Sequence, residues 1–393
     1  MKVITDVKKI EGILTRGVER VYPDKSTLEK VLMSGKKIRL YYGIDPTGST
    51  LHLGHLVQLL KLKKFQDLGH EVIILIGDFT AQIGDPSDKQ TTRKPLTHKQ
   101  VLENAKGYKK QISKILDLKK SNVRFLHNEK WTNKLTPKDM LELASHFTVS
   151  NLLTRSMFQE RIKAGREIYV HEFLYPIFQA YDAVTMDVDL QIGGNDQMFN
   201  MLAGRDLMKR KSNKEMFVLT TKLLIDSTGK KMGKTEGNMI TLNDSANDMF
   251  GKVMSWPDGM IILGFEICTD LNFSDFIKEK PRDQKIKLAY EIVKIYHGEK
   301  KAEEAEKNFI NTFQKKEIPT EMEEIKCSNG ELLSEVLVRN KILSSKSEWR
   351  RLVLENAVHD LSKNGNVTDV NLKISENLTL KIGKKRFVKI MQK

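Results

Sequence analysis

Two short segments carry the residues with the clearest chemical potential. The first, YYGIDPTGSTLHLGH at 41–55, places His52 and His55 one helical turn apart, directly after a turn sequence. A helix starting there would present free N–H groups and its positive dipole end, which suit phosphate. The two histidines could instead be surface residues or a metal pair, but a metal would need a third ligand and an HExxH-like context, which are missing.

The same segment indicates how that helix would begin. Ser49 or Thr50 is expected to cap it, because a hydroxyl can accept from the first free N–H groups. Gly54, between the histidines, would let a ligand approach the backbone closely.

The second segment is STGKKMGKTEGN at 227–238. Its glycines favour mobility, and Lys231 and Lys234 could clamp an anion. Gly229 and Gly233 are separated by three residues rather than the four of a Walker A loop, so a P-loop ATPase is excluded. An ordinary lysine-rich surface turn is the alternative.

Taken together, the two segments resemble the HIGH and KMSKS signatures of class I aminoacyl-tRNA synthetases, with HLGH for HIGH and KMGKT for KMSKS. Three further segments resemble the bacterial type of tyrosyl-tRNA synthetase: IGDPSDKQTTR at 83–93, YPIFQAYD at 175–182 and QIGGNDQ at 191–197. The likeness covers about 35–245. It resumes at 330–358, which resembles an S4-type RNA-binding module.

The resemblance implies a two-step reaction. Tyrosine attacks the α-phosphate of ATP to give tyrosyl-adenylate and pyrophosphate, and the tyrosyl group then passes to the 3′ end of tRNA(Tyr). The attacking carboxylate is already ionised, so catalysis should consist of positioning and charge stabilisation without a general base. Mg²⁺ should accompany ATP, bound mainly through the phosphates, with no metal site in the protein. A homodimer, with an interface near 130–165, and a cytoplasmic location are also expected.

The resemblance assigns the tyrosine site to residues from several segments. Tyr41 and Asp182 would read the hydroxyl, with Asn128 as a support, and Asp85, Tyr175 and Gln179 would surround the ammonium group. Tyr175, Gln179 and Asp182 are spaced by four and three residues, so a helix would place them on one face. Polar residues on that face favour a ligand-facing surface over a core stripe.

The resemblance also assigns the nucleotide site. Residues expected near the ribose and the tyrosine carboxyl are Gly43, Asp45, Gly193, Asp196 and Gln197. Residues expected to bind ATP or act on its phosphates are Thr47, His52, Gly54, His55, Lys89, Arg93, Lys231, Met232 and Lys234.

The composition is typical of a globular protein that binds a polyanionic partner. The 393 residues are 39% hydrophobic, without an apolar run that would span a membrane or form a secretory signal. The net charge of +15 suggests a nucleic-acid partner, although a lysine-rich genome could produce the same balance. The two cysteines, Cys268 and Cys327, suit a reducing compartment.

Hydrophobic periodicity predicts an α/β chain with a Rossmann-type parallel sheet. Strands are expected at 38–45, 71–78, 122–127 and 217–226, alternating with helices at 52–69, 97–118 and 171–186. The resemblance implies a catalytic domain at 1–245, an α-helical anticodon-recognition domain at 246–325 and a small α+β S4-like domain at 326–393, and the polar stretch at 314–330 predicts a linker.

The last domain is expected to contact RNA through basic residues. The candidates on its helices and last strands are Lys341, Lys346, Arg350, Arg351, Lys381, Lys384, Lys385 and Arg386. Trp349 is expected in the core rather than on a base-stacking surface.

Three other functions compete with this interpretation. A tryptophanyl-tRNA synthetase shares fold and signatures, but Tyr41, Asp182, the QIGGNDQ segment and the tail argue against it. A non-catalytic RNA-binding synthetase homologue would not need intact signatures. An unrelated adenylyltransferase with an HxGH loop would lack the tail.

Overall fold

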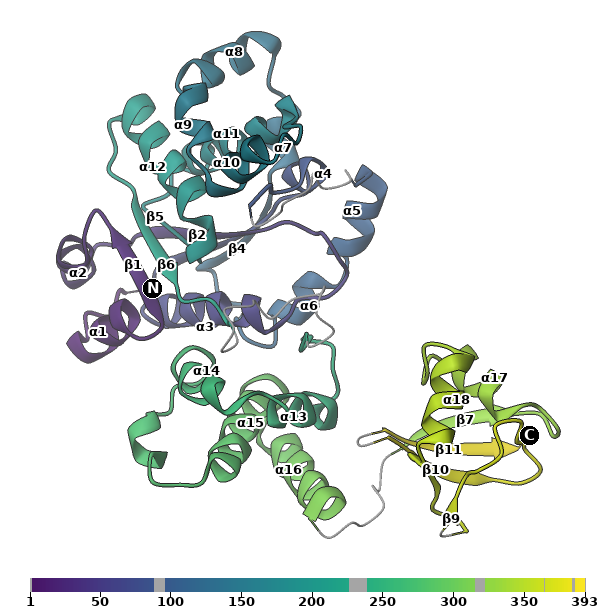
Figure 1. The fold of residues 1–393 in the computed structure, drawn as a ribbon. Coiled ribbons are helices and arrows are strands. Elements are labelled where there is room, and N and C mark those ends of the chain that lie inside the picture. Colours follow the sequence, from purple (N-terminus) through teal and green to yellow (C-terminus); the bar gives the residue numbers. More distant parts are fainter. Residues whose placement is uncertain are drawn as a thin grey trace. The chain divides into compact units, whose positions relative to one another are not determined.

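The computed structural model describes residues 2–87, 96–225, 239–314, 322–363, 365–383 and 386–392. The chain forms two compact units, residues 1–303 and 304–393, which are described separately. Figure 1 shows the course of the chain. No helix in these described ranges is long and apolar enough to cross a membrane.

The first unit is built on a six-stranded sheet in the order β1-β6-β5-β2-β3-β4. Its strands are β1 (Val18–Tyr22), β2 (Arg39–Ile44), β3 (Glu71–Ile76), β4 (Val123–His127), β5 (Leu190–Gly194) and β6 (Phe217–Thr221). All pairs are parallel except that of the edge strand β1 with β6. The predicted parallel α/β fold is therefore confirmed.

The strand order reverses between β2 and β5, where the chain crosses to the other half of the sheet. In open α/β sheets, ligands bind at such a switch point, beyond the carboxyl ends of the strands. Asp45 directly follows β2, and Gly193 and Gly194 end β5. The fold thus brings residues about 150 positions apart to one crevice.

Helices cover both faces of this sheet (Figure 1). Side chains of α11 (Val170–Thr185) and α12 (Met198–Ser212) share a buried cluster with β2, β3 and β6, and α3 (Leu53–Asp67) lies across the sheet from them. The helices to residue 212 are α1 (Val7–Thr15), α2 (Lys25–Met33), α3 (Leu53–Asp67), α4 (Thr80–Ile83), α5 (His98–Ala105), α6 (Tyr108–Ile112), α7 (Glu129–Thr132), α8 (Pro137–Ser145), α9 (Val149–Leu153), α10 (Ser156–Lys163), α11 (Val170–Thr185), η1 (Asn195–Gln197) and α12 (Met198–Ser212).

Two local predictions about these helices were wrong. The helix expected at 97–118 is broken near Gly107 into α5 and α6. The N-cap of α3 is His52 rather than Ser49 or Thr50, because the imidazole nitrogen of His52 accepts from the N–H of Gly54.

A helical segment completes the first unit and is held by the N-terminal helix. It contains α13 (Ala246–Met254), η3 (Asp258–Met260), α14 (Ile261–Cys268), η4 (Phe273–Phe276) and α15 (Pro281–His297), and α16 (Glu299–Gln314) follows it. Arg16, which caps α1, donates to the carbonyls of Phe265, Thr269 and Leu271 at the end of α14. Helix α1 was not predicted from the sequence.

The second unit contains a five-stranded sheet in the order β7-β11-β10-β8-β9. Its elements are β7 (Glu323–Cys327), α17 (Leu333–Arg339), α18 (Lys346–Leu354), β8 (Val358–Asp360), β9 (Gly365–Asn366), β10 (Leu378–Ile382) and β11 (Arg386–Gln392). The linker predicted at 314–330 is wrong over 323–327, since β7 pairs in parallel with β11. The predicted domain boundary at 326 falls inside that strand.

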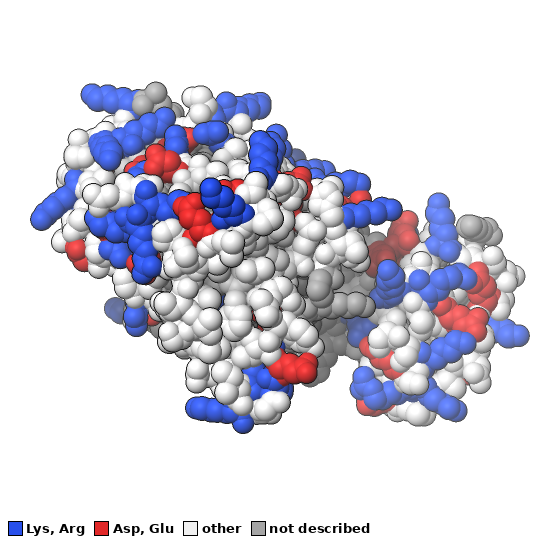
Figure 2. Space-filling view, turned by 90° about the horizontal axis from the view of Figure 1, so that it is seen from above, with Lys and Arg blue, Asp and Glu red and all other residues white. Residues whose placement is uncertain are grey.

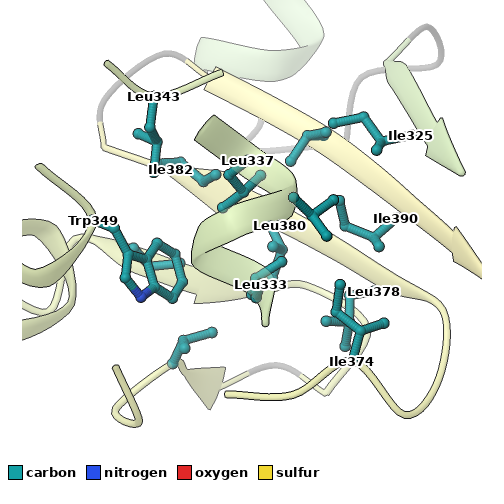
Figure 3. Close-up of a cluster of buried hydrophobic side chains, with 14 of the residues drawn as sticks. Ile325, Leu333, Leu337, Leu343, Trp349, Ile374, Leu378, Leu380, Ile382 and Ile390 are labelled. Atoms are coloured by element: carbon teal, nitrogen blue, oxygen red, sulfur yellow. The ribbon is translucent and has the colours of Figure 1, made fainter. Parts of the chain in front are cut away.

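The core of the second unit lies between this sheet and its two helices (Figure 3). Leu333 and Leu337 of α17 point toward Leu380 and Ile390 of the sheet. Trp349 is 1% exposed, and its indole nitrogen donates to the carbonyl of Val370 at 2.8 Å. The predicted core position of Trp349 is confirmed.

Candidate active site

A cavity of about 360 Å³ opens at the switch point between β2 and β5. Its volume is in the range of small-molecule sites. Of the residues predicted for the tyrosine site and the nucleotide site, every one that the structure describes lines this cavity, with one exception. They are Tyr41, Gly43, Asp45, Thr47, His52, Gly54, His55, Asp85, Tyr175, Gln179, Asp182, Gly193, Asp196 and Gln197. The exception, Asn128, contacts Asp182 through a hydrogen bond.

The deep end of the cavity holds a buried carboxyl beside a buried phenol. Asp182 is 2% exposed, and it accepts hydrogen bonds from Asn128 Nδ2 at 3.1 Å and Trp131 Nε1 at 2.7 Å. Tyr41 is 1% exposed, and within the described residues its hydroxyl has no hydrogen-bond partner. A buried hydroxyl left unpaired costs about 1–3 kcal/mol, so this end of the cavity favours a ligand with a polar group.

Burial dominates the electrostatics at this end. It raises the pKa of Asp182 to about 8, although the two hydrogen bonds from Asn128 and Trp131 act in the opposite direction. Burial and the charge of Asp182 also raise the pKa of Tyr41. A strongly shifted carboxyl in a cleft is a mark of functional sites.

Asp45 forms the centre of a hydrogen-bond network along one wall. Its Oδ1 accepts from the hydroxyl of Thr80 at 2.8 Å, and its Oδ2 accepts from the hydroxyl of Tyr175 at 2.9 Å. Thr80 in turn accepts from Asn128 Nδ2 at 3.1 Å. A Cβ at Gly77 would lie 2.0 Å from Asp45 Oδ1, so glycine is required there. The network connects Asp45 with Asp182 through Asn128 and Thr80.

A second carboxylate of the cavity wall, Asp85, is held by several neighbouring side chains. Its Oδ2 accepts from Gln197 Nε2 at 2.6 Å, and its Oδ1 accepts from the N–H and the hydroxyl of Ser87. Arg155 lies 3.7 Å from Oδ1 and donates to Ser87 Oγ at 2.5 Å. The guanidinium also lies over the ring of Phe199, 5.0 Å from its centre. Asp85 therefore keeps its orientation before any ligand arrives.

The two histidines cap helix α3 reciprocally. His52 Nδ1 accepts from the N–H of Gly54 at 3.1 Å, and His55 Nδ1 accepts from the N–H of His52 at 3.2 Å. A neutral imidazole that accepts through Nδ1 carries its proton on Nε2. Both histidines line the cavity. A Cβ at Gly54 would lie 2.8 Å from the His52 ring, so glycine makes room for the ring as well as for a ligand.

The residues that flank the second signature, the lysine segment at 227–238, lie beside the cavity and the histidine segment. Leu223 and Leu224, just before it, line the cavity. Just after it, the carbonyl of Ile240 accepts from the N–H of Leu53, and Leu242 donates to the carbonyl of Leu51. The flanks of the lysine segment therefore meet the histidine segment directly.

A further carboxyl lies at the end of β5. Burial, followed by the charge of Asp85, raises the pKa of Asp196 to about 6. Gly193 is packed so closely that a Cβ would lie 2.9 Å from the sulfur of Met201.

Several predicted site residues lie outside the described residues. They are Lys89, Arg93, Lys231, Met232 and Lys234 for the phosphates, and Lys384 and Lys385 for RNA.

The predicted RNA contacts that are described lie on the surface of the second unit. Arg350 and Arg351 are exposed on α18. Three of the residues form ion pairs within the unit: Lys346 with Glu335, Arg351 with Glu355, and Arg386 with Glu348. Such exposed pairs contribute about 0–1 kcal/mol, so phosphate groups could compete for these cations.

The structure adds two site residues that sequence reasoning missed, Trp131 and Arg155. Each contacts a predicted residue that is far away in the sequence: Trp131 donates to Asp182, 51 positions away, and Arg155 lies 3.7 Å from Asp85. Trp131 follows Asn128 by three residues, which places the two on one side of a helical turn. That spacing was the available signal.

Comparison with known proteins agrees with this geometry. A family described as class I tRNA synthetases (W and Y) matches residues 33–314. A tyrosine–tRNA ligase from Carboxydothermus hydrogenoformans is 42% identical, with 99% of each chain covered. One from Thermotoga maritima is 41% identical, with 96% of each chain covered.

Solved structures show the same fold at lower identity. The tyrosyl-tRNA synthetase from Archaeoglobus fulgidus, complexed with L-tyrosine, has a TM-score of 0.60 at 22% identity, over 76% of this chain and 99% of that one. A C-terminally truncated mitochondrial tyrosyl-tRNA synthetase from Coccidioides posadasii has a TM-score of 0.62 at 24% identity, over 76% and 91%. The chain therefore belongs to the class I aminoacyl-tRNA synthetases and, within them, to the tyrosyl-tRNA synthetases.

Proposed function

We propose that this protein is a tyrosine–tRNA ligase that activates L-tyrosine with ATP and transfers it to tRNA(Tyr). The observation that best supports the proposal is the buried pair of Tyr41 and Asp182 at the deep end of the cavity. A ligand phenol placed between Tyr41 and Asp182 would satisfy both, because Tyr41 can donate and a carboxylate can accept. Phenylalanine would leave the Tyr41 hydroxyl unpaired and would offer no donor to the buried Asp182 carboxylate, which gives strong discrimination, and tyrosyl-tRNA synthetases are the standard example of this effect.

The remaining wall residues suit the other parts of the substrates. Asp85, Gln179 and Tyr175 offer a carboxylate and neutral acceptors to an ammonium group. Asp196 and Gly193, at the end of β5, line the cavity, and the Asp196 carboxyl could accept from ribose hydroxyls. Tyrosine would thus lie with its ring toward Asp182 and its carboxylate toward the nucleotide.

The phosphate end is supported by the histidine segment. Nε2–H groups of His52 and His55, the hydroxyl of Thr47 and the N-terminal end of α3 all offer positive partial charge at the cavity. In-line attack of the carboxylate on the α-phosphate places new charge on the phosphate oxygens, and prearranged donors stabilise that charge. Lys89, Arg93, Lys231 and Lys234 are proposed to complete this environment.

Mg²⁺ is proposed to accompany ATP. Across the described residues, no cluster of three or more His, Cys, Asp or Glu side chains could hold a metal ion. A protein cage does not fit those residues, so the ion would be carried mainly by phosphate oxygens, as Mg²⁺ commonly is with nucleotides.

One assay separates this function from its competitors. Pyrophosphate exchange into ATP is measured with tyrosine, tryptophan, phenylalanine or no amino acid. Exchange that depends on tyrosine alone is expected. Exchange with tryptophan, or exchange without any amino acid, would refute the proposal in favour of a tryptophan enzyme or an unrelated adenylyltransferase. No exchange at all would favour the non-catalytic homologue.

We propose that tRNA contacts involve the helical segment after residue 245 and the S4-like second unit, whose sheet includes β7 from Glu323 onward. The net charge of +15 supports a polyanionic partner, and Figure 2 shows basic side chains widespread on the face in view. Deleting residues 322–393 removes β7 together with the sheet it joins. The truncated protein should keep tyrosine-dependent exchange and lose most tRNA charging; undiminished charging would exclude a role for this unit.

A homodimer in the cytoplasm is the last part of the proposal. Large apolar side chains are exposed between residues 137 and 170, namely Leu141, Val149, Ile162, Tyr169 and Val170, and a second copy would cover such a surface. Both cysteines are free thiols, which suits a reducing compartment. Sedimentation of the purified protein at the mass of a monomer would exclude the dimer.

A further inference from the structure

The backbone of the first signature is held from behind by three side chains of α5 and α6. Asn104 Nδ2 donates to the carbonyl of Pro46 at 2.9 Å, and the hydroxyl of Tyr108 donates to the carbonyl of Gly48 at 2.6 Å. Gln111 uses both ends of its amide. Its Nε2 donates to the carbonyl of Ser49 at 3.1 Å, and its Oε1 accepts from the N–H of Leu51 at 2.8 Å.

The three side chains recur at helical spacing. Four positions separate Asn104 from Tyr108 and three separate Tyr108 from Gln111, so they face the loop in one row although the helix breaks near Gly107. Tyr108 and Gln111 are each 3% exposed. A Cβ at Gly107 would lie 3.2 Å from Gln111 Nε2, which shows how closely this row packs.

The hydrogen bonds from Asn104, Tyr108 and Gln111 fix the direction in which the peptide dipoles of residues 46–51 point. A carbonyl oxygen carries partial negative charge and would repel a nearby triphosphate. Because the C=O and N–H of a trans peptide point in opposite directions, holding the carbonyls of Gly48 and Ser49 toward α6 turns the following N–H groups away from α6. The row also fixes Leu51, the residue that precedes the His52 cap.

We propose that Asn104, Tyr108 and Gln111 are positioning residues for the phosphate-binding loop of the activation reaction. They touch no substrate themselves. They hold residues 46–51 so that Thr47 and His52 meet the phosphates in the transition state. This inference rests on the proposed function, since it assumes that ATP binds at this loop.

The test uses Tyr108→Phe, which removes one hydroxyl and keeps the ring. The single-turnover rate of tyrosyl-adenylate formation should fall on the order of tenfold, because one buried hydrogen bond to the loop is lost. The dissociation constant of tyrosine should stay within about twofold, because the tyrosine end of the cavity is untouched. Gln111→Met, which removes two hydrogen bonds, should lower the same rate further.

Two controls accompany these variants. Tyr22→Phe makes the same chemical change at a hydroxyl that contacts the sulfur of Met198 instead of the loop. Lys110→Ala alters an exposed side chain of α6. Both should keep the wild-type rate, and all variants are compared at equal folded fraction by thermal unfolding.

Two outcomes would overturn the inference. One is an unchanged adenylate rate in Tyr108→Phe. The other is a loss of tyrosine affinity as large as the loss of rate, which would mean general damage to the fold. Wild-type protein without tyrosine-dependent exchange would instead overturn the proposed function.

Discussion

The hydrogen bond from Trp131 to Asp182 should set the pH range in which tyrosine binds. Trp131→Phe removes the indole N–H that donates to Asp182 Oδ1 at 2.7 Å and keeps an aromatic ring in place. Asn128 remains as the other donor. The carboxylate loses one of the two groups that favour its ionised form.

The size of the effect follows from the energy of that bond. A hydrogen bond to a charged group contributes about 1.5–3 kcal/mol. One pKa unit corresponds to about 1.36 kcal/mol. The pKa of Asp182, already raised to about 8 by burial, should therefore rise by about one to two further units in the variant.

The direction of the pH dependence follows from the protonation state of Asp182 that tyrosine binding favours. In the proposed binding mode the tyrosine hydroxyl donates to the ionised carboxylate of Asp182, so binding would favour loss of the Asp182 proton. Wild-type affinity should rise as pH increases toward 8 and level off above it, because the free carboxyl is then already ionised. In Trp131→Phe the rise should continue to higher pH, so that affinity at pH 8 is about 5- to 50-fold weaker.

Calorimetric titration with tyrosine, in two buffers of different ionisation enthalpy, counts the protons released. At pH 7 the wild type should release protons on binding tyrosine, since burial raises the pKa of Asp182 to about 8 and the free carboxyl is mostly protonated there. Asp182→Asn should release none. Wild-type affinity that stays flat between pH 6 and 8, or a midpoint that moves down in Trp131→Phe, would refute the reasoning.

Three further predictions concern single side chains. His52→Ala should slow adenylate formation on the order of 100-fold with tyrosine affinity retained, in rapid-quench measurements; weakened tyrosine binding at a normal rate would contradict the role of His52. Arg155→Leu, which releases Asp85 and Ser87, should weaken tyrosine about tenfold in equilibrium dialysis but not the tyrosine analogue that lacks the ammonium group; equal loss for both ligands would argue against this positioning. Trp349→Ala should destabilise the second unit by about 3–5 kcal/mol in denaturant unfolding, since its indole is buried, whereas little change would place it outside the core.

Much of the site could be predicted because the relevant signals are local in the sequence. Tyr175, Gln179 and Asp182 follow helical spacing, and all three line the cavity from α11. The nearly uninterrupted apolar run of β3 indicated a strand buried on both faces, and its residues 72–76 are indeed buried. Patterns of this kind report on one element at a time.

The rest depended on contacts between distant elements. Nothing near Arg155 indicates that its guanidinium reaches Asp85 and Ser87, because that contact depends on how α10 packs. The short β7 was hidden in a polar stretch, where only Ile325 and Cys327 are buried. The row of Asn104, Tyr108 and Gln111 has helical spacing, but the carbonyls it holds carry no signature of side-chain type.

The order of strands in the first sheet has a consequence for synthesis on the ribosome. β2 can pair with β3 soon after both are made. Its other neighbour, β5, is made about 150 residues later, and β6, the partner of β1, is made about 200 residues after β1. A nascent chain of that length exposes an unpaired, apolar strand edge, the kind of surface that aggregates or recruits chaperones. We expect the tyrosine cleft to be a late product of translation, completed only after β5 has left the exit tunnel.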